Sequence, residues 1–118
     1  MWMRKFSNAA RGIKIAVRGE ISFFGHLLAT TVVVLAGAVL DISQTSWCLL
    51  TLCIALVLVA EMFNTAIERL SRVITEEHNP RIRDALDVCA GAVLLASGGA
   101  VIVGIVLLGR PLLRWLGG

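Results

Sequence analysis

Three long apolar blocks constrain the fold of this chain more than any other feature. They run from about residue 26 to 40, from 47 to 67 and from 88 to 108. A helix needs about 20 apolar residues to cross the roughly 30 Å hydrocarbon core of a bilayer. The second and third blocks are long enough, and the first is long enough if its helix begins near Ile21. The pattern predicts an all-α integral membrane protein, with three transmembrane helices in one domain covering residues 1–118.

The composition excludes a soluble monomer. Of the 118 residues, 58% are hydrophobic and 16% are charged, whereas soluble domains carry about 25% charged residues. The formal net charge is +3, and the basic residues lie beside the apolar blocks. Basic residues in that position face anionic lipid headgroups and orient a membrane protein. We therefore expect the lipid bilayer, and not a nucleic acid, as the partner of these charges.

An amphipathic surface helix is predicted before the first span, over about residues 4–24. Its basic face carries Arg4, Arg11, Lys14 and Arg18. The opposite face is apolar and carries Phe6, Ala9, Ile13, Val17 and Phe24. A helix with one basic and one apolar face is typical of a segment that lies in the membrane interface.

The distribution of basic residues predicts the orientation of the chain. The first twenty residues hold five basic side chains, the loop over residues 41–46 holds none, and the segment 68–87 holds four arginines. Basic residues near spans accumulate on the cytoplasmic side. The N-terminus and the 68–87 segment are therefore expected in the cytoplasm, and the C-terminus outside.

A stripe of polar residues on the second block is the strongest signal of a functional site. Glu61, Asn64 and Glu68 are spaced so that they share one face of a helix. Glu61 lies about 12 Å deeper than Arg69 at the helical rise of 1.5 Å per residue, where an unpaired carboxylate costs several kcal/mol. A hydrogen bond between packed subunits would also explain a buried Asn. Two carboxylates and an amide on one face favour a site.

Glu20 supplies a further carboxylate. The helical phase places it on the apolar side of the surface helix, directed toward the bundle, although a helix ending near Gly19 would leave it solvated. If it points inward, it meets Glu68 and Glu61 at the cytoplasmic boundary. Clustered carboxylates repel unless a hard cation joins them, and Mg²⁺ prefers one or two carboxylates together with substrate phosphates.

A turn over residues 76–80 is predicted to lead into the third span, where Arg83 and Asp87 share a helix face. Asp87 could form a salt bridge with Arg83, or it could contact a phosphate or a metal. The sequence contains no glycine-rich nucleotide loop, so carboxylates, metal and basic residues would have to hold a nucleotide. The isolated His26 is interpreted as structural.

The run Ala60-Glu61-Met62-Phe63-Asn64-Thr65-Ala66-Ile67-Glu68 closely resembles a family signature, E-x-x-N-[ST]-A-I-E. This signature belongs to the small prokaryotic integral-membrane lipid kinases, the diacylglycerol kinase and undecaprenol kinase family. The resemblance extends from about Phe6 to Leu108, and His26-Leu27-Leu28 is more similar to the undecaprenol kinase branch. Leu86 stands where the family's A-K-D motif has lysine.

The resemblance implies a homotrimer in the bacterial inner membrane that transfers the γ-phosphoryl group of MgATP to a lipid hydroxyl, on diacylglycerol or undecaprenol, at the cytoplasmic interface. The implied catalytic residues are Glu61, as base, with Asn64 and Asp87. The implied metal ligands are Glu20 and Glu68, with Mg²⁺ as cofactor. The expected ATP-binding set is Glu20, Glu68, Asp87, Arg83 and Arg11.

Two other functions are compatible with the pattern. A small proton-coupled transporter would use a deep carboxylate such as Glu61, but the acidic residues cluster toward one end and three spans lack paired halves. A non-catalytic member of the same family would explain Leu86 at the lysine position.

Overall fold

The chain folds into four helices over the residues that the structure describes, which are 1–19, 21–74 and 77–118 of a computed structural model. The helices are α1 (Trp2–Gly19), α2 (Ile21–Leu40), α3 (Gln44–Ile74) and α4 (Pro80–Gly117). No strand occurs among these described residues. The prediction of an all-α chain is confirmed.

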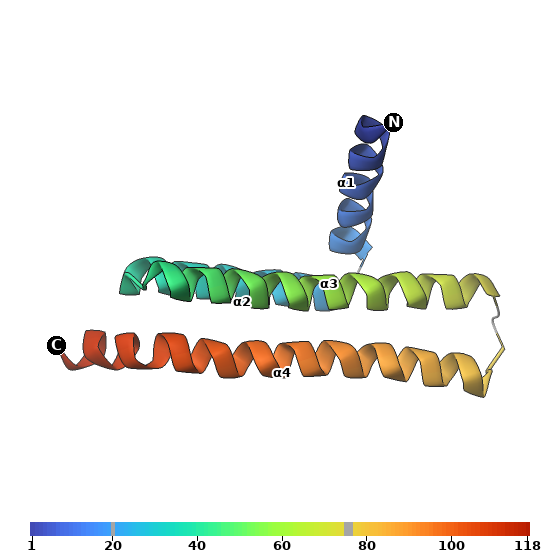
Figure 1. The fold of residues 1–118 in the computed structure, drawn as a ribbon. Coiled ribbons are helices and arrows are strands. Elements are labelled where there is room, and N and C mark those ends of the chain that lie inside the picture. The colour runs from blue at the N-terminus through green and yellow to red at the C-terminus, as the bar shows by residue number, and fades with distance from the viewer. Residues whose placement is uncertain (20, 75–76) are drawn as a thin grey trace.

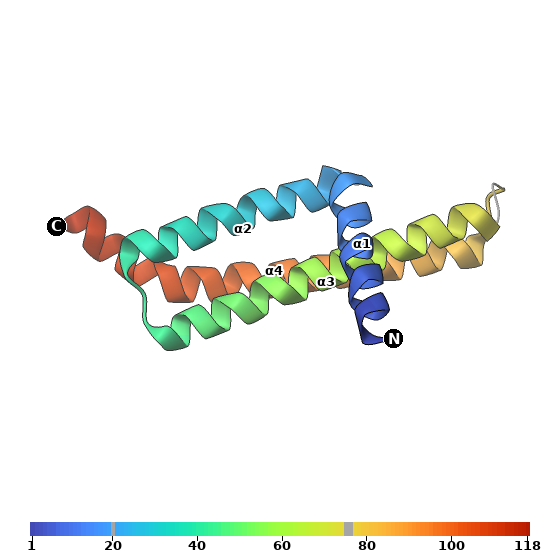
Figure 2. The ribbon, with the colours of Figure 1, turned by 90° about the horizontal axis from the view of Figure 1, so that it is seen from above.

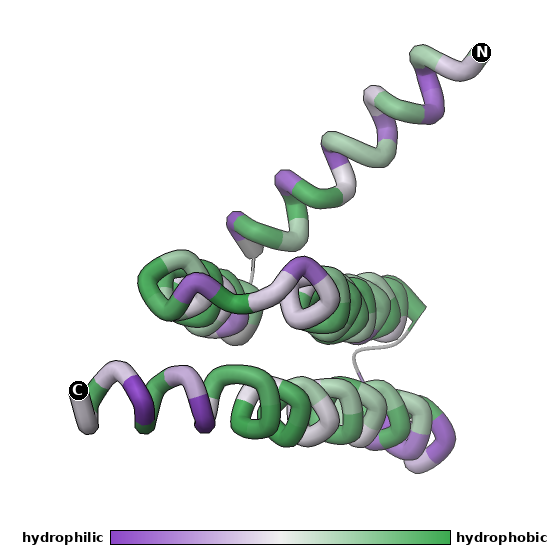
Figure 3. Tube along the Cα trace, turned by 60° about the vertical axis from the view of Figure 1, so that its left-hand side comes forward, coloured by the Kyte–Doolittle hydropathy of each residue, from purple (hydrophilic) through white to green (hydrophobic). Residues whose placement is uncertain are grey.

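Three of the helices, α2, α3 and α4, are long and apolar enough to span a membrane. They lie side by side along their lengths and alternate in direction, while α1 projects steeply away from them (Figures 1 and 2). Figure 3 shows hydrophobic residues along the middle of the three long helices, and hydrophilic residues on α1, in the α2–α3 turn and near the ends of α4. The three expected spans are therefore present, and the chain is a membrane protein.

The helix α2 begins at Ile21, as the first block required in order to span, and has 20 residues. The helices α3 and α4 extend beyond their apolar blocks, to 31 and 38 residues, and α4 continues through Pro111. The prediction of one helix over residues 4–24 was wrong at its end, since α1 stops at Gly19 and Phe24 belongs to α2. Glycine is a poor helix former, and the chain changes direction there (Figure 1).

The starts of α3 and α4 are fixed by side chains that accept a backbone hydrogen bond. The hydroxyl of Ser43 accepts from the backbone N–H of Ser46 at 3.1 Å. The side-chain oxygen of Asn79 accepts from the backbone N–H of Arg81 at 3.0 Å, and Pro80 follows Asn79. Both caps satisfy N–H groups that have no partner within the helix. The predicted turn before the third span is confirmed at residues 77–79, whereas Pro80 already belongs to α4.

The burial pattern of the single chain differs from that of a soluble protein, because many large apolar side chains are exposed and two polar residues are buried. Large apolar side chains such as Leu94 and Leu95 are exposed on α4, whereas Glu61 and Thr65 on α3 are each only 3% exposed. Apolar atoms facing outward suit lipid or a neighbouring membrane helix. The buried polar groups mark the inner face of α3 as the place to examine for a site.

Candidate active site

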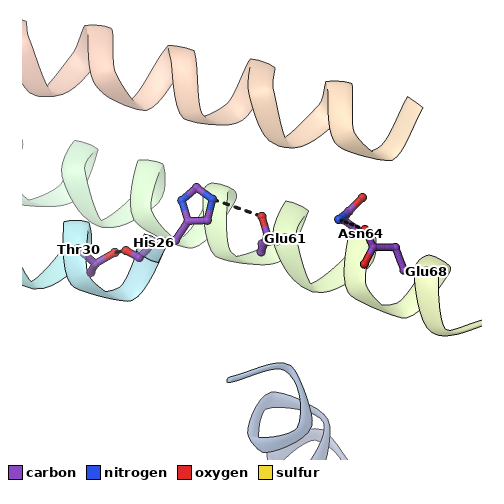
Figure 4. Close-up of polar contacts among 5 residues, drawn as sticks. All are labelled: His26, Thr30, Glu61, Asn64 and Glu68. Atoms are coloured by element: carbon purple, nitrogen blue, oxygen red, sulfur yellow. Dashed lines mark hydrogen bonds and ion pairs between the residues drawn. The ribbon is translucent and has the colours of Figure 1, made fainter. Parts of the chain in front are cut away.

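The buried carboxylate of Glu61 contacts a histidine from another helix. Nε2 of His26, on α2, lies 3.3 Å from Oε2 of Glu61, on α3 (Figure 4). The Glu61 side chain is 4% exposed and the His26 side chain 26%. The interpretation of His26 as isolated was wrong. A single titratable residue near the start of an apolar span was the available signal, but its partner is 35 positions away in the sequence and no local spacing could connect the two.

The next turn of α3 carries the other polar residues of the predicted stripe. Nδ2 of Asn64 donates to Oε1 of Glu68 at 3.2 Å, and both side chains project from the same face (Figure 4). The Asn64 Oδ1 and Thr65 Oγ1 atoms are buried and have no hydrogen-bond partner among the described residues. Buried polar atoms are costly unless they are satisfied. This part of α3 therefore offers oxygen atoms suited to a ligand.

An apolar groove between α2, α3 and α4 begins beside the histidine. It has a volume of about 570 Å³, and His26 and Thr30 line it together with Ser97 and apolar residues that reach Leu112. Along α4 the distance from Ser97 to Leu112 is about 22 Å at 1.5 Å per residue. A groove of this length and composition can hold a hydrocarbon chain, with its polar end near His26.

A basic hollow lies between α1 and α3. It is lined by Arg11, Lys14, Arg18 and Arg69, with Ile15, and has a volume of about 440 Å³. Arg11 was expected at the site. Arg69 was not, because it belongs to no recognisable motif. Four cationic side chains from two helices form a surface suited to a phosphorylated ligand. The hollow lies toward the same end of α3 as Glu68.

Asp87 and Glu68 lie at similar heights on the antiparallel pair α3 and α4. Glu68 is about 9 Å from the end of α3 and Asp87 about 10 Å from the start of α4, by the helical rise. Arg83 and Asp87 are both exposed, and no ion pair joins them in the described part of the chain. The suggested Arg83–Asp87 salt bridge is therefore not formed, and both side chains are accessible to other groups.

The expected metal cluster falls partly outside the described residues. Glu20, a predicted metal and ATP ligand, is not described. Within residues 1–19, 21–74 and 77–118, no three His, Cys, Asp or Glu side chains are close enough together to hold a metal ion. Of the predicted cluster the structure describes Glu68, whose carboxylate accepts from Asn64, and Glu61, whose carboxylate contacts His26.

Comparison with known proteins identifies the class of protein to which the chain belongs. Residues 7–108 match the family of prokaryotic diacylglycerol kinases. The undecaprenol kinase of Bacillus subtilis is 32% identical over 106 residues, which cover 90% of this chain and 86% of that protein. A diacylglycerol kinase of Synechocystis sp. is 34% identical over 109 residues, which cover 92% of this chain and 62% of that protein.

The chain belongs to the prokaryotic diacylglycerol kinase family. The family and both relatives are kinases, and the chain is accordingly a phosphotransferase of the lipid kinase class. The resemblance predicted from the Glu61–Glu68 signature is confirmed.

Proposed function

We propose that this protein transfers the γ-phosphoryl group of ATP to the hydroxyl of a membrane lipid, either undecaprenol or diacylglycerol, at the cytoplasmic face of the bacterial inner membrane. The observation that supports it best is the position of Glu61. Its buried carboxylate contacts His26, and His26 lines the polar end of an apolar groove between the spans. A lipid chain in this groove would bring its hydroxyl to the carboxylate.

Phosphoryl transfer requires little covalent chemistry from the protein. Phosphoryl transfer depends mainly on positioning and on neutralising charge. Glu61 accepts the proton of the lipid hydroxyl while the hydroxyl oxygen attacks the γ-phosphorus. The bond between that phosphorus and the leaving oxygen of ADP breaks. The basic hollow of Arg11, Lys14, Arg18 and Arg69 binds the phosphates from the aqueous side. Lipid and nucleotide would thus approach from opposite directions.

The Asn64–Glu68 pair fits a magnesium ion. Mg²⁺ takes hard oxygen ligands and is held by one or two carboxylates plus substrate phosphates. Glu68 offers a carboxylate, and Asn64 Oδ1 is a buried acceptor with no partner among the described residues. Glu68 and Glu20 would hold the ion, with Asn64 beside them. When bound, the ion would neutralise phosphate charge during transfer.

The exposed apolar side chains and the basic residues of the chain support a proposal for its assembly and sidedness. The span of α4 has none of its residues buried in the single chain, so its apolar side chains need lipid or neighbouring helices. We propose that α4 contributes to a homotrimer. The basic residues of α1 and of the α3–α4 hairpin favour a cytoplasmic N-terminus and an external C-terminus. In this orientation α1 lies on the membrane surface.

A phosphoryl-transfer assay tests the proposal directly. The full chain in phospholipid vesicles is given ATP labelled in its γ-phosphoryl group, Mg²⁺, and undecaprenol, diacylglycerol or a shorter polyprenol in separate reactions. We expect labelled lipid phosphate from at least one of these alcohols, and at least about 100-fold less in the same vesicles with Glu61→Gln. ATP hydrolysis that does not depend on added alcohol, with no labelled lipid, would contradict the proposal.

A further inference from the structure

We propose that His26 is a positioning residue, which holds the carboxylate of Glu61 in the orientation needed to accept a proton from the lipid hydroxyl. The inference rests on the proposed function, in which Glu61 is the base. It adds a residue from a different helix to that function.

The contact joins two helices at a buried point. Nε2 of His26 is 3.3 Å from Oε2 of Glu61, and no other hydrogen bond to the Glu61 side chain occurs among the described residues. A carboxylate that is only 4% exposed has little water to solvate it. The imidazole therefore supplies the polar contact that a buried carboxylate needs.

The chemistry of the pair defines which nitrogen carries the proton. An ionised carboxylate can only accept hydrogen bonds, so the Nε2 atom that faces it carries a hydrogen. A neutral imidazole with the proton on Nε2 satisfies the contact without a second charge. The orientation of the carboxylate is then determined by the contact with α2, and not by the rotamer preference of Glu61 alone.

Other polar side chains described on α2 do not make such a contact. Thr30 donates its hydroxyl hydrogen to the backbone oxygen of His26 at 2.8 Å, and Thr31 donates to that of Leu27 at 2.9 Å. Both are therefore satisfied within their own helix, whereas His26 reaches across to α3 (Figure 4). A histidine that only filled space would not need to face the buried carboxylate.

His26 also joins the groove to the base. Its side chain lines the apolar groove and contacts Glu61. A lipid hydroxyl that enters along the groove meets the imidazole beside the carboxylate. Fixing a catalytic group in this way matters because a displacement of about 1 Å can lower a rate about 100-fold.

The kinetic test uses three variants of the full chain in vesicles. His26→Leu removes the donor and keeps comparable bulk, His26→Gln keeps an N–H donor, and Thr31→Val is the control on the same helix because Thr31 is exposed and does not line the groove. We expect His26→Leu to lower kcat about 10- to 100-fold with an unchanged KM for MgATP. His26→Gln should recover most of kcat, and Thr31→Val should match the native protein.

A double-mutant comparison separates positioning from a structural role. In the Glu61→Gln background, His26→Leu should lower the residual kcat less than about twofold, since residues that act through one another are not additive. A further loss as large as in the native background would overturn the inference. So would equal losses in His26→Leu and His26→Gln.

A spectroscopic measurement tests the contact without relying on turnover. In protein labelled with ¹⁵N at its histidines, Glu61→Gln should shift the imidazole resonances of His26 and leave those of His78, an exposed residue of the α3–α4 turn, unchanged. Unshifted His26 resonances would overturn the inference even in an active enzyme. If Glu61→Gln shifts the His26 resonances but the native protein phosphorylates no lipid, the result would support the pairing and contradict the proposed function.

Discussion

The amide of Asn64 donates to the carboxylate of Glu68 one helical turn further along α3, at 3.2 Å. This bond directs the Asn64 carbonyl oxygen away from Glu68, and that oxygen is buried with no partner in the described part of the chain. The pair thus combines a carboxylate, held in place by an amide, with an unused hard acceptor. It lies toward the C-terminal end of α3, where the metal-bound nucleotide of the proposed function would approach.

Removing the charge of Glu68 should increase the requirement for magnesium. We expect Glu68→Gln to raise the Mg²⁺ concentration for half-maximal activity about tenfold or more, because an amide is a weaker ligand for a hard cation than a carboxylate. The measurement is a magnesium titration of lipid phosphorylation at saturating ATP. Asp41→Asn, which removes an exposed carboxylate at the opposite end of the spans, is the control. An unchanged half-maximal concentration in Glu68→Gln would assign Glu68 another role.

Neutralising Glu61 should abolish most of the turnover while preserving nucleotide binding. We expect Glu61→Gln to lower kcat about 100- to 1,000-fold, because an amide of the same shape cannot accept the hydroxyl proton. Nucleotide affinity should change little, since the basic hollow that is proposed to bind the phosphates lies elsewhere. Steady-state kinetics and equilibrium binding of a non-hydrolysable ATP analogue measure the two effects. Native turnover in Glu61→Gln would remove Glu61 from the role of base.

Most of the fold could be predicted from the sequence because the bilayer requires long apolar helices. The end of α1 could not be decided, because Gly19 allows a helix end there, as the structure has it, while the amphipathic pattern continues through Gly19 to Phe24. Within one helix, spacing correctly places Glu61, Asn64 and Glu68 on a shared face. The contact of Glu61 with His26 depends on how α2 packs against α3, which no periodicity in the sequence specifies.

The orientation of the chain in the membrane, which is predicted from its charge distribution, can be tested by chemical labelling. Ser43 and Asn79 cap helices, so the reporters are placed at the neighbouring exposed residues Thr45 and His78. In a background without the three native cysteines, Thr45→Cys should react with an impermeant thiol reagent added to intact cells. His78→Cys should react only after permeabilisation. The opposite pattern would place the acidic residues of α3 away from cytoplasmic ATP.

The final prediction concerns Leu86, which stands where the A-K-D motif of the family resemblance has lysine. A cation near the transferring phosphate stabilises the charge that develops on it, and one such contact can change kcat about 100-fold. Arg83 is the candidate substitute on α4. It is exposed, lies three residues before Leu86, and forms no ion pair with Asp87 in the described structure.

Its guanidinium is therefore available to the γ-phosphoryl group if Asp87 contacts that group, as the family resemblance implies. We expect Arg83→Ala to lower lipid phosphorylation about tenfold or more, and Leu86→Lys added to it to restore part of the activity, because lysine would supply a cation one turn away. Arg110→Ala, which removes an exposed arginine at the opposite end of α4, controls for loss of a basic side chain in general. If Arg83→Ala is harmless while Leu86→Lys alone raises activity strongly, Arg83 does not substitute for the lysine, and the native enzyme works without a cation at this point.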